Sequence, residues 1–220
     1  MKTEKEIMRR KQIRTVVILC ILVILGGIGI GNRIINSGHG PYAGVNLEKH
    51  ISLPDYKGIN PDDFEGDKEE LQAQIWNQLL AETEVKKYPK KQVKAYYEKN
   101  LAHYEKLAAD YGYESFDAYI QNEFGSDVEA FEEQLTTYAE SEVKNDMLVS
   151  AIAERENIFV QSDEYEKYLN EALEEADMDR ETFEKQFGMT LEEYAEDKNM
   201  EIRFLQNKVM QKIVDDLKEN

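Results

Sequence analysis

The side chains that most often do chemistry in proteins are few and far apart in this sequence. Three histidines occur, at His39, His50 and His103, and the one cysteine, Cys20, lies within an apolar run. A zinc site needs about four nitrogen or sulfur ligands, and a charge-relay site needs a histidine beside a nucleophile and an acid. The spacing therefore indicates neither kind of site, and a single cysteine excludes a disulfide within one chain.

One acidic stretch, residues 62–67, contains part of the pattern of a calcium-binding loop. When Gly66 is placed at the turn position of such a loop, Pro61 falls where the first carboxylate ligand should be. A solvated acidic linker is the simpler interpretation. Pairs of carboxylates carry no further information in a chain with 45 acidic residues. We therefore predict no catalytic residue, no metal site and no cofactor.

The charge of the chain is strongly negative and unevenly distributed. The whole sequence carries a net charge of −18, of which residues 1–14 contribute +4 and everything after Gly31 contributes −22. Binding to nucleic acid depends on neutralising phosphates with Lys and Arg. A body this acidic predicts that nucleic acid is not a partner.

Residues 15–31 form an uncharged apolar stretch that two further isoleucines could extend to residue 35. As a helix, such a stretch is about 25 Å long, at the short end of what spans a bilayer. A cleaved signal peptide is the alternative, because glycines end the stretch, but the run exceeds the usual ~7–15 residues and no A-x-A pattern follows. The basic residues before it favour a cytoplasmic N-terminus. We expect a cytoplasmic segment at residues 1–14, a single-pass anchor in the cell membrane at residues 15–35, and the acidic body outside.

Glycine and proline divide the remainder of the chain into two parts. Residues 36–66 hold three of the four prolines and several glycines, which is typical of a flexible tether, with a short extended piece predicted at residues 45–53. From residue 67 onward only three glycines and Pro89 occur. Because residues that break helices are so rare there, we predict that residues 67–220 form long helices.

Capping residues and apolar spacing place these helices. Helix starts are predicted at Asp67 with Glu70, Pro89, Ser115, Ser126 with Glu129, Ser162, and Thr190 with Glu193, with another short helix around Phe183 and Phe187. Glycines 112, 125 and 188 are expected to end helices. Residues 158–160 are predicted to be an extended connector, and the helix from Thr190 is expected to continue to the C-terminus. No segment has the period of a strand, so the predicted fold is all-α. The predicted core residues are Leu71, Ile75, Leu135, Leu148, Ile152, Leu169, Leu205 and Val209.

The chain also repeats itself. Residues 124–131 (FGSDVEAF) match residues 187–194 (FGMTLEEY) 63 positions later, and each match follows a short aromatic helix and precedes a long helix. Two helical hairpins could share such a helix-stop, helix-start pattern by chance. The recurrence of the short aromatic helix favours true structural repetition. We predict an elongated domain of two units, each with a helix, a short helix and a long helix.

Several segments resemble the C-terminal domain of bacterial trigger factor. They are residues 79–85 (LLAETEV) with Tyr88 and Pro89, residues 131–135 (FEEQL), and residues 148–158 (LVSAIAERENI) followed by residues 160–164 (VQSDE). The last pair is similar to the family's joint, I-A-x-x-E-x-I-x-V-[ST]-x-E-E. Residues 53–59 (LPDYKGI) are similar to the family's lead into its isomerase domain. Extracytoplasmic foldases of the SurA and PrsA type share a related helical chaperone domain.

Two parts of trigger factor are missing from the sequence. The ribosome-docking loop, G-F-R-x-G-x-x-P, does not occur, and only eight residues separate Gly58 from Asp67, where an isomerase domain would need about 80–100 residues. The resemblance therefore implies a chaperone domain that binds unfolded or newly exported polypeptides, without ribosome docking and without prolyl isomerase or other enzyme activity. The alternative is a helical scaffold that docks one specific partner of the envelope or secretion apparatus.

A chaperone of this kind needs apolar surface that contacts many sequences, and aromatic and Met side chains provide it. The chain has 13 Tyr, 8 Phe and 7 Met, of which we expect more than half of the aromatics to be core. The aromatics between residues 96 and 124 are too many for one stripe of a thin helical arm. The predicted client-binding residues are Tyr96, Tyr97, Tyr104, Tyr111, Phe116, Tyr119 and Phe124.

Overall fold

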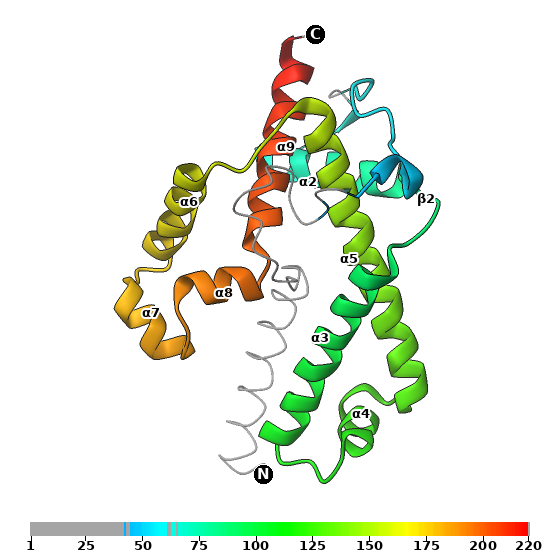
Figure 1. The fold of residues 1–220 in the computed structure, drawn as a ribbon, viewed down its shortest axis with the longest axis vertical. Helices are drawn as coiled ribbons and strands as arrows, with labels where there is room; N and C mark the ends of the chain where they lie inside the picture. Colours follow the sequence, from blue (N-terminus) through cyan, green and yellow to red (C-terminus); the bar gives the residue numbers. More distant parts are fainter. Residues whose placement is uncertain (1–41, 43–44, 61–62, 65, 220) are drawn as a thin grey trace.

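The computed structural model describes residue 42 and residues 45–60, 63–64 and 66–219 (Figure 1). The elements in chain order are the 3-10 helix η2 (Leu47–Lys49), β1 (Ile51–Ser52), α2 (Lys68–Glu82), β2 (Glu84–Val85), α3 (Lys90–Asp110), α4 (Phe116–Phe124), α5 (Val128–Glu156), α6 (Ser162–Glu175), α7 (Arg180–Phe187), α8 (Leu191–Asp197) and α9 (Met200–Glu219). The described chain is mostly helical, which agrees with the all-α prediction. The two strands pair antiparallel, with Ile51 opposite Val85, and are too short to show a period in the sequence.

The predicted membrane anchor at residues 15–35 lies outside the described residues, as does the basic segment before it. Within the part of the chain that the structure describes, no helix combines the length and the apolar character needed to cross a bilayer. The anchor and the topology stay predictions.

Local capping explains where most helices begin. The backbone N–H of Glu70 donates to Asp67 Oδ1 at 3.0 Å, and the N–H of Asp67 donates back to Glu70 Oε2 at 3.2 Å, which is the reciprocal pattern predicted for this start. Thr190 and Glu193 form the second predicted capping box. The start of α5 differs by one residue, because the Asp127 carboxylate, rather than the Ser126 hydroxyl, accepts the N–H of Ala130 at 2.8 Å.

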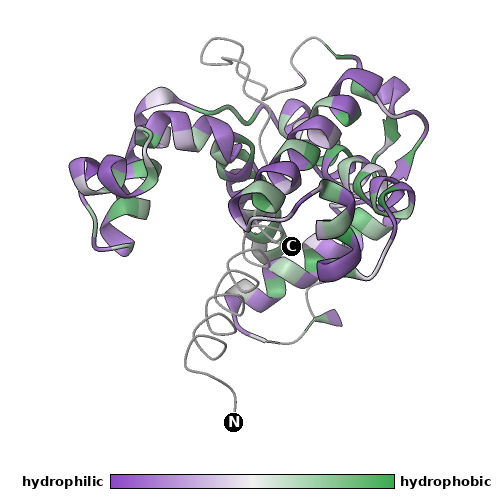
Figure 2. Cartoon of the chain, turned by 90° about the horizontal axis from the view of Figure 1, so that it is seen from below, coloured by the Kyte–Doolittle hydropathy of each residue, from purple (hydrophilic) through white to green (hydrophobic). Residues whose placement is uncertain are grey.

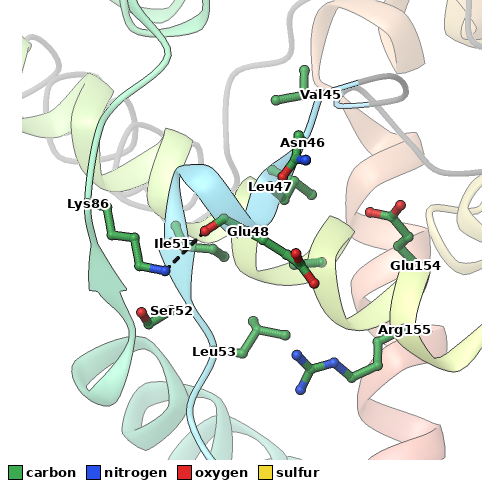
Figure 3. Close-up of a pocket in the computed structure, with 11 residues that line it drawn as sticks. Val45, Asn46, Leu47, Glu48, Ile51, Ser52, Leu53, Lys86, Glu154 and Arg155 are labelled. Carbon is green, nitrogen blue, oxygen red and sulfur yellow. Dashed lines mark hydrogen bonds between the residues drawn. The ribbon is translucent and has the colours of Figure 1, made fainter.

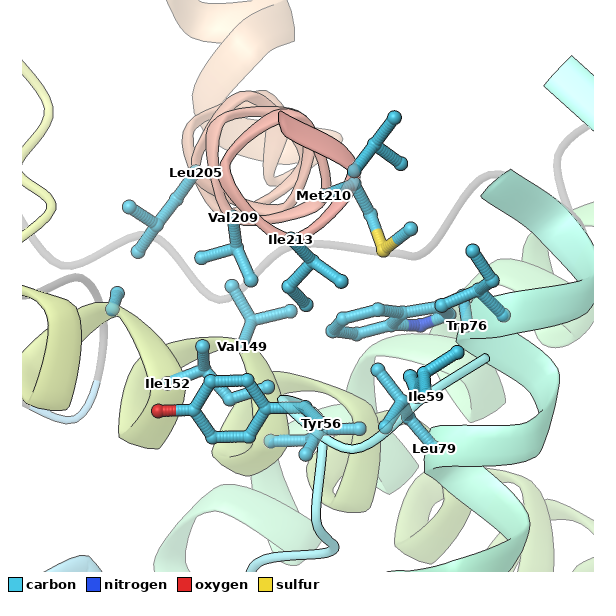
Figure 4. Close-up of a cluster of buried hydrophobic side chains, with 14 of the residues drawn as sticks. Tyr56, Ile59, Trp76, Leu79, Val149, Ile152, Leu205, Val209, Met210 and Ile213 are labelled. Carbon is cyan, nitrogen blue, oxygen red and sulfur yellow. The ribbon is translucent and has the colours of Figure 1, made fainter. Parts of the chain in front are cut away.

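The body of the molecule is built where α2, the C-terminal half of α5 and α9 meet. Figure 4 shows Trp76 of α2, Val149 of α5 and Ile213 of α9 pointing into one apolar core. The Trp76 indole also donates to Asn145 Oδ1 at 2.8 Å. Of the predicted core residues, Leu71 is partly buried and the others are buried: Ile75, Leu135, Leu148, Ile152, Leu169, Leu205 and Val209.

The predicted tether at residues 36–66 is wrong for its described part. Five of its apolar side chains are buried. Tyr56 and Ile59 belong to a cluster with residues of α2, α5 and α9, and Tyr42, Leu47 and Ile51 belong to a second cluster with residues of α5 and α3. Tyr56 also donates its hydroxyl to Glu156 Oε1 at 2.5 Å, and Lys57 Nζ lies 2.8 Å from the same oxygen. The packed domain therefore begins before residue 67.

The predicted unbroken last helix is also wrong. Asn199 has a positive φ of 53°, which ends the helical path after α8 and starts α9 in a new direction. Asparagine tolerates this left-handed conformation better than most residues. The chain therefore turns a corner at residues 198–199, and the second predicted unit has its long helix divided into α8 and α9.

Two arms extend from the body (Figure 1). The first arm consists of α3, α4 and the N-terminal half of α5, and the second consists of α6, α7 and α8. Seen from below, the α6–α7 end of the second arm projects away from the rest of the chain, and apolar residues are interspersed with hydrophilic ones along it (Figure 2). The α5–α6 connector that leads into the second arm is extended, as predicted.

Candidate functional site

The tip of the first arm is a cluster of aromatic rings. The Phe124 ring centroid lies 5.7 Å from that of Tyr104 and 5.0 Å from that of Phe131, and Tyr104 meets Phe131 at 5.1 Å, nearly edge-on. Aromatic pairs prefer such spacings and angles. Gly125, at a φ of 67°, ends α4 directly after Phe124 and turns the chain into α5. Phe124 thus has one face on the cluster, yet 47% of its surface is exposed.

The tip of the second arm carries a similar cluster. Phe187 is the last residue of α7 and Gly188, at a φ of 70°, follows it. The Phe187 ring lies 4.4 Å from Phe183 and 5.4 Å from Tyr194 of α8. Phe183 is buried, whereas Phe187 is 39% exposed. The sequence analysis did not select Phe187 for client binding, although the 63-residue repeat pairs it with Phe124 and could have found it.

The seven predicted client-binding residues do not all reach the surface. Tyr111 and Phe124 are exposed, and Tyr97, Tyr104 and Phe116 are half-buried in the first-arm cluster. The prediction needs correction for Tyr96 and Tyr119, which are only 1% and 3% exposed. Tyr119 is enclosed by Tyr113, Phe116 and Phe124. In this conformation neither buried tyrosine can contact a client.

The hydroxyl of Tyr96 makes two hydrogen bonds inside the protein, and these offset the cost of burying it. It donates to Asp146 Oδ2 of α5 at 2.6 Å and accepts from Asn199 Nδ2 at 3.0 Å. Burial raises the pKa of Asp146 to about 8, and the Tyr96 hydrogen bond opposes that rise. Burial likewise raises the pKa of the Tyr96 phenol. This is a structural network, far from the exposed tips.

The surface around both tips is rich in carboxylates. Exposed acidic residues near the first tip include Asp117, Glu123 and Glu129, and near the second Glu184 and Glu192. Basic residues at the tips are paired with acids: Lys106 Nζ lies 3.0 Å from Asp110, Lys185 Nζ lies 2.6 Å from Glu181, and Arg180 contacts Glu192. A charged rim of this kind keeps a protein soluble while its apolar rings stay open to solvent.

An open groove lies on the body, between residues 45–53 and the C-terminal half of α5. Its volume is about 960 Å³. Figure 3 shows Leu53 on one side and Arg155 on the other, with Lys86 Nζ donating to the main-chain oxygen of Glu48 at 3.0 Å. The lining mixes apolar side chains with the charged Glu48, Lys86 and Arg155.

Across residues 42, 45–60, 63–64 and 66–219, no three His, Cys, Asp or Glu side chains gather in a way that could hold a metal ion. His39 and Cys20 lie outside these residues, and His50 Nδ1 lies within hydrogen-bonding distance, 2.8 Å, of the main-chain oxygen of Lys87. The absence of a cofactor stays a prediction.

The described chain thus has two helical arms, each with a partly exposed aromatic ring at its tip, carried by a helical body. The family model for the C-terminus of the bacterial trigger factor protein matches residues 63–215. The chain therefore belongs to the trigger factor C-terminal family, whose domain is the chaperone part of that protein. No curated protein and no solved structure matches the chain.

Proposed function

We propose that this protein is a membrane-anchored chaperone that holds unfolded, newly exported polypeptides on the two aromatic tips of its arms. The family supports a chaperone-like role. The observation that carries the proposal is the exposure of Phe124 and Phe187, at matching positions of two arms. A large aromatic ring that stays in water at two corresponding sites is unfavourable unless something covers it.

The chemistry of the tips suits a holdase better than a selective receptor. Each tip offers a partly exposed aromatic ring, which can contact any apolar side chain of a client. Two tips on one chain act on the same client, and such linked contacts raise the apparent affinity by about 10²–10⁴ over either contact alone. Weak single contacts then suffice, and a client that folds and buries its apolar residues is released.

The proposed location rests on the N-terminal sequence. Four basic residues, Arg9, Arg10, Lys11 and Arg14, precede the apolar stretch, and the −22 body follows it. The positive-inside bias places such a body on the outer face of the membrane. The clients are then segments that emerge from export, and the protein acts on them by binding and not by prolyl isomerisation.

Aggregation of chemically denatured proteins tests the proposal. The full chain, at micromolar concentration, should suppress aggregation of several unrelated denatured proteins. The double variant Phe124→Ser/Phe187→Ser should lose most of this effect. The matched control is Phe159→Ser, which changes a ring of similar exposure, 40%, in the α5–α6 connector away from both tips.

The outcomes separate the candidate roles. Suppression that depends on Phe124 and Phe187 but not on Phe159 supports the proposal. A protein that ignores denatured chains and retains a single folded partner is a scaffold, and that result overturns the holdase role. Equal loss in the double variant and the Phe159→Ser control would exclude the tips as the binding site.

A further inference from the structure

Hydrogen bonds between the buried side chains of Asp146 and Tyr96 and the partly buried Asn199 join α5, α3 and the turn between α8 and α9. Asp146 of α5 is 3% exposed, the Tyr96 hydroxyl of α3 donates to its Oδ2, and the Asn199 amide donates to the Tyr96 hydroxyl. Asn199 is the residue that turns the chain from α8, in the second arm, into α9 of the body. These hydrogen bonds therefore connect α5 and α3 to the turn at residues 198–199, where the direction of the second arm relative to α9 is set.

A second contact ties the same corner to α3 one turn further along. Lys99 Nζ lies 2.8 Å from Asp197 Oδ1 and also donates to the main-chain oxygen of Asp197. Asp197 is the last residue of α8. Beyond this corner, the second arm meets the body through α6 packed on α9. The Tyr96 and Lys99 contacts are thus well placed to control the spacing between the arms.

We propose that Asp146, Tyr96 and Asn199 form a latch that fixes the second arm relative to the first, and that ionisation of Asp146 releases it. A neutral carboxyl can be buried at small cost, whereas an ionised one without a cation partner in the interior is strongly unfavourable. Movement of the α8–α9 corner away from α3 would admit water to the ionised carboxylate. The arms would then separate in alkaline conditions and close again when the proton returns.

The groups that face Asp146 come from every element packed around it. Burial raises its pKa to about 8, and the charge of Glu142, one turn away on α5, adds to the rise. Hydrogen bonds from Tyr96 and Asn145 and the charge of Arg203 on α9 oppose it. The Tyr42 phenol, in the segment before η2, also lies close enough for the Asp146 charge to raise its pKa. A protonated Asp146 removes the repulsion from Glu142 and the cost of burying a charge, and its oxygen still accepts the hydrogen bond from Tyr96.

The spacing between the arms can be measured in the full chain with a pair of spin labels. Gln121 of α4 and Gln186 of α7 are exposed and lie on opposite arms, so Gln121→Cys and Gln186→Cys in a Cys20→Ser background take the labels. At about pH 6 the labels should give one main distance. A longer distance should gain population as the pH rises toward about 8, the pKa of the buried Asp146, and should predominate at about pH 9.

Three variants decide what causes the change. Asp146→Asn keeps the shape of the side chain but cannot ionise, so it should hold the short distance at about pH 9. Asn199→Gly keeps the left-handed backbone and removes the amide, and Tyr96→Phe keeps the ring and removes the hydroxyl; both should give the longer distance already at about pH 6. Asn157→Gly is the control, since it changes another left-handed residue, at a φ of 54°, that takes no part in the latch.

Some results would overturn the latch. If the Asp146→Asn variant opens with pH as the parent does, the titrating group is another one, such as Lys99, whose pKa burial lowers. If Asn157→Gly separates the labels as much as Asn199→Gly, the effect is general loosening of the arm. An unchanged distance in the parent from about pH 6 to about pH 9 would also exclude the proposal. None of these outcomes bears on whether the tips bind clients.

Discussion

Phe124 and Phe187 occupy the same position in two successive helical units of one chain. Each is the last residue of a short helix, each is followed by a glycine in the left-handed conformation, and each packs its ring against an aromatic residue of the next helix. Those partners, Phe131 and Tyr194, are themselves related by the same 63-residue offset. The repeat in the sequence is therefore a repeat in the structure, and it produces two exposed rings, one on each arm.

The half-buried aromatics of the first arm should behave as core residues. We expect the triple variant Tyr97→Ser/Tyr104→Ser/Phe116→Ser to unfold far more easily than the parent, because full truncation of a buried ring costs about 3–5 kcal/mol and a half-buried ring a substantial part of that. Trp76, the single tryptophan, is buried in the body and reports unfolding by its fluorescence. Leu148→Ala is the reference, with an expected loss of about 2–5 kcal/mol. A triple variant as stable as the parent would show that these rings are open surface.

The segment before α2 should contribute to stability. Tyr56 is 4% exposed and packs in the body core, so Tyr56→Ala should lower the unfolding free energy by about 3–5 kcal/mol, and Tyr56→Phe, which loses only the hydrogen bond to Glu156, by about 1 kcal/mol. Asn46→Ala, at an exposed position of the same segment, should stay within about ±0.5 kcal/mol. Denaturant unfolding of the three variants measures this. Equal stabilities would mean that residues 42–60 are a free tether.

Stability should fall as the pH rises through neutrality, and Asp146 should account for part of the fall. Its folded-state pKa of about 8 lies above the ordinary value of 3.8, so between these values the folded protein binds a proton that the unfolded chain does not. The unfolding free energy then decreases by up to about 1.4 kcal/mol per pH unit in this window and levels off above about pH 8. Asp146→Asn should remove this slope. If parent and variant have the same pH dependence from about pH 5 to about pH 8, Asp146 is not the buried acid that titrates.

The N-terminal charges predict the topology of the chain in the membrane. A reporter fused after Asn220 should behave as exported, and protease added to cells without a wall should digest the body and leave a membrane-embedded fragment. Replacing the four basic residues Arg9, Arg10, Lys11 and Arg14 with Ser should weaken this orientation, since they carry the bias. A body that stays protected from protease in these cells without a wall would contradict the proposed location.

Most helix boundaries could be predicted from the sequence because they depend on neighbours within one turn. The capping pairs Asp67 with Glu70 and Thr190 with Glu193 are three residues apart, and the left-handed glycines lie at the ends of their own helices. The repeat that places Phe124 and Phe187 is equally local, since the Phe124–Phe131 and Phe187–Tyr194 contacts each join two consecutive helices.

Burial could not be predicted in the same way, because it depends on partners far along the chain. The hydroxyl of Tyr96 is held by a residue 50 positions later, and that of Tyr56 by one 100 positions later. Whether an aromatic residue on a helix faces a core or a client, and whether a Gly- and Pro-rich segment hangs free or packs, is decided by which surface lies opposite it. The sequence by itself determined most helix positions, the capping pairs, and the 63-residue repeat that gives each arm the same exposed ring. Only the tertiary structure decided that Tyr96 is internal, that residue 42 and residues 45–60 belong to the body, and that Asn199 divides the last helix, since each depends on contacts made after the helices have assembled.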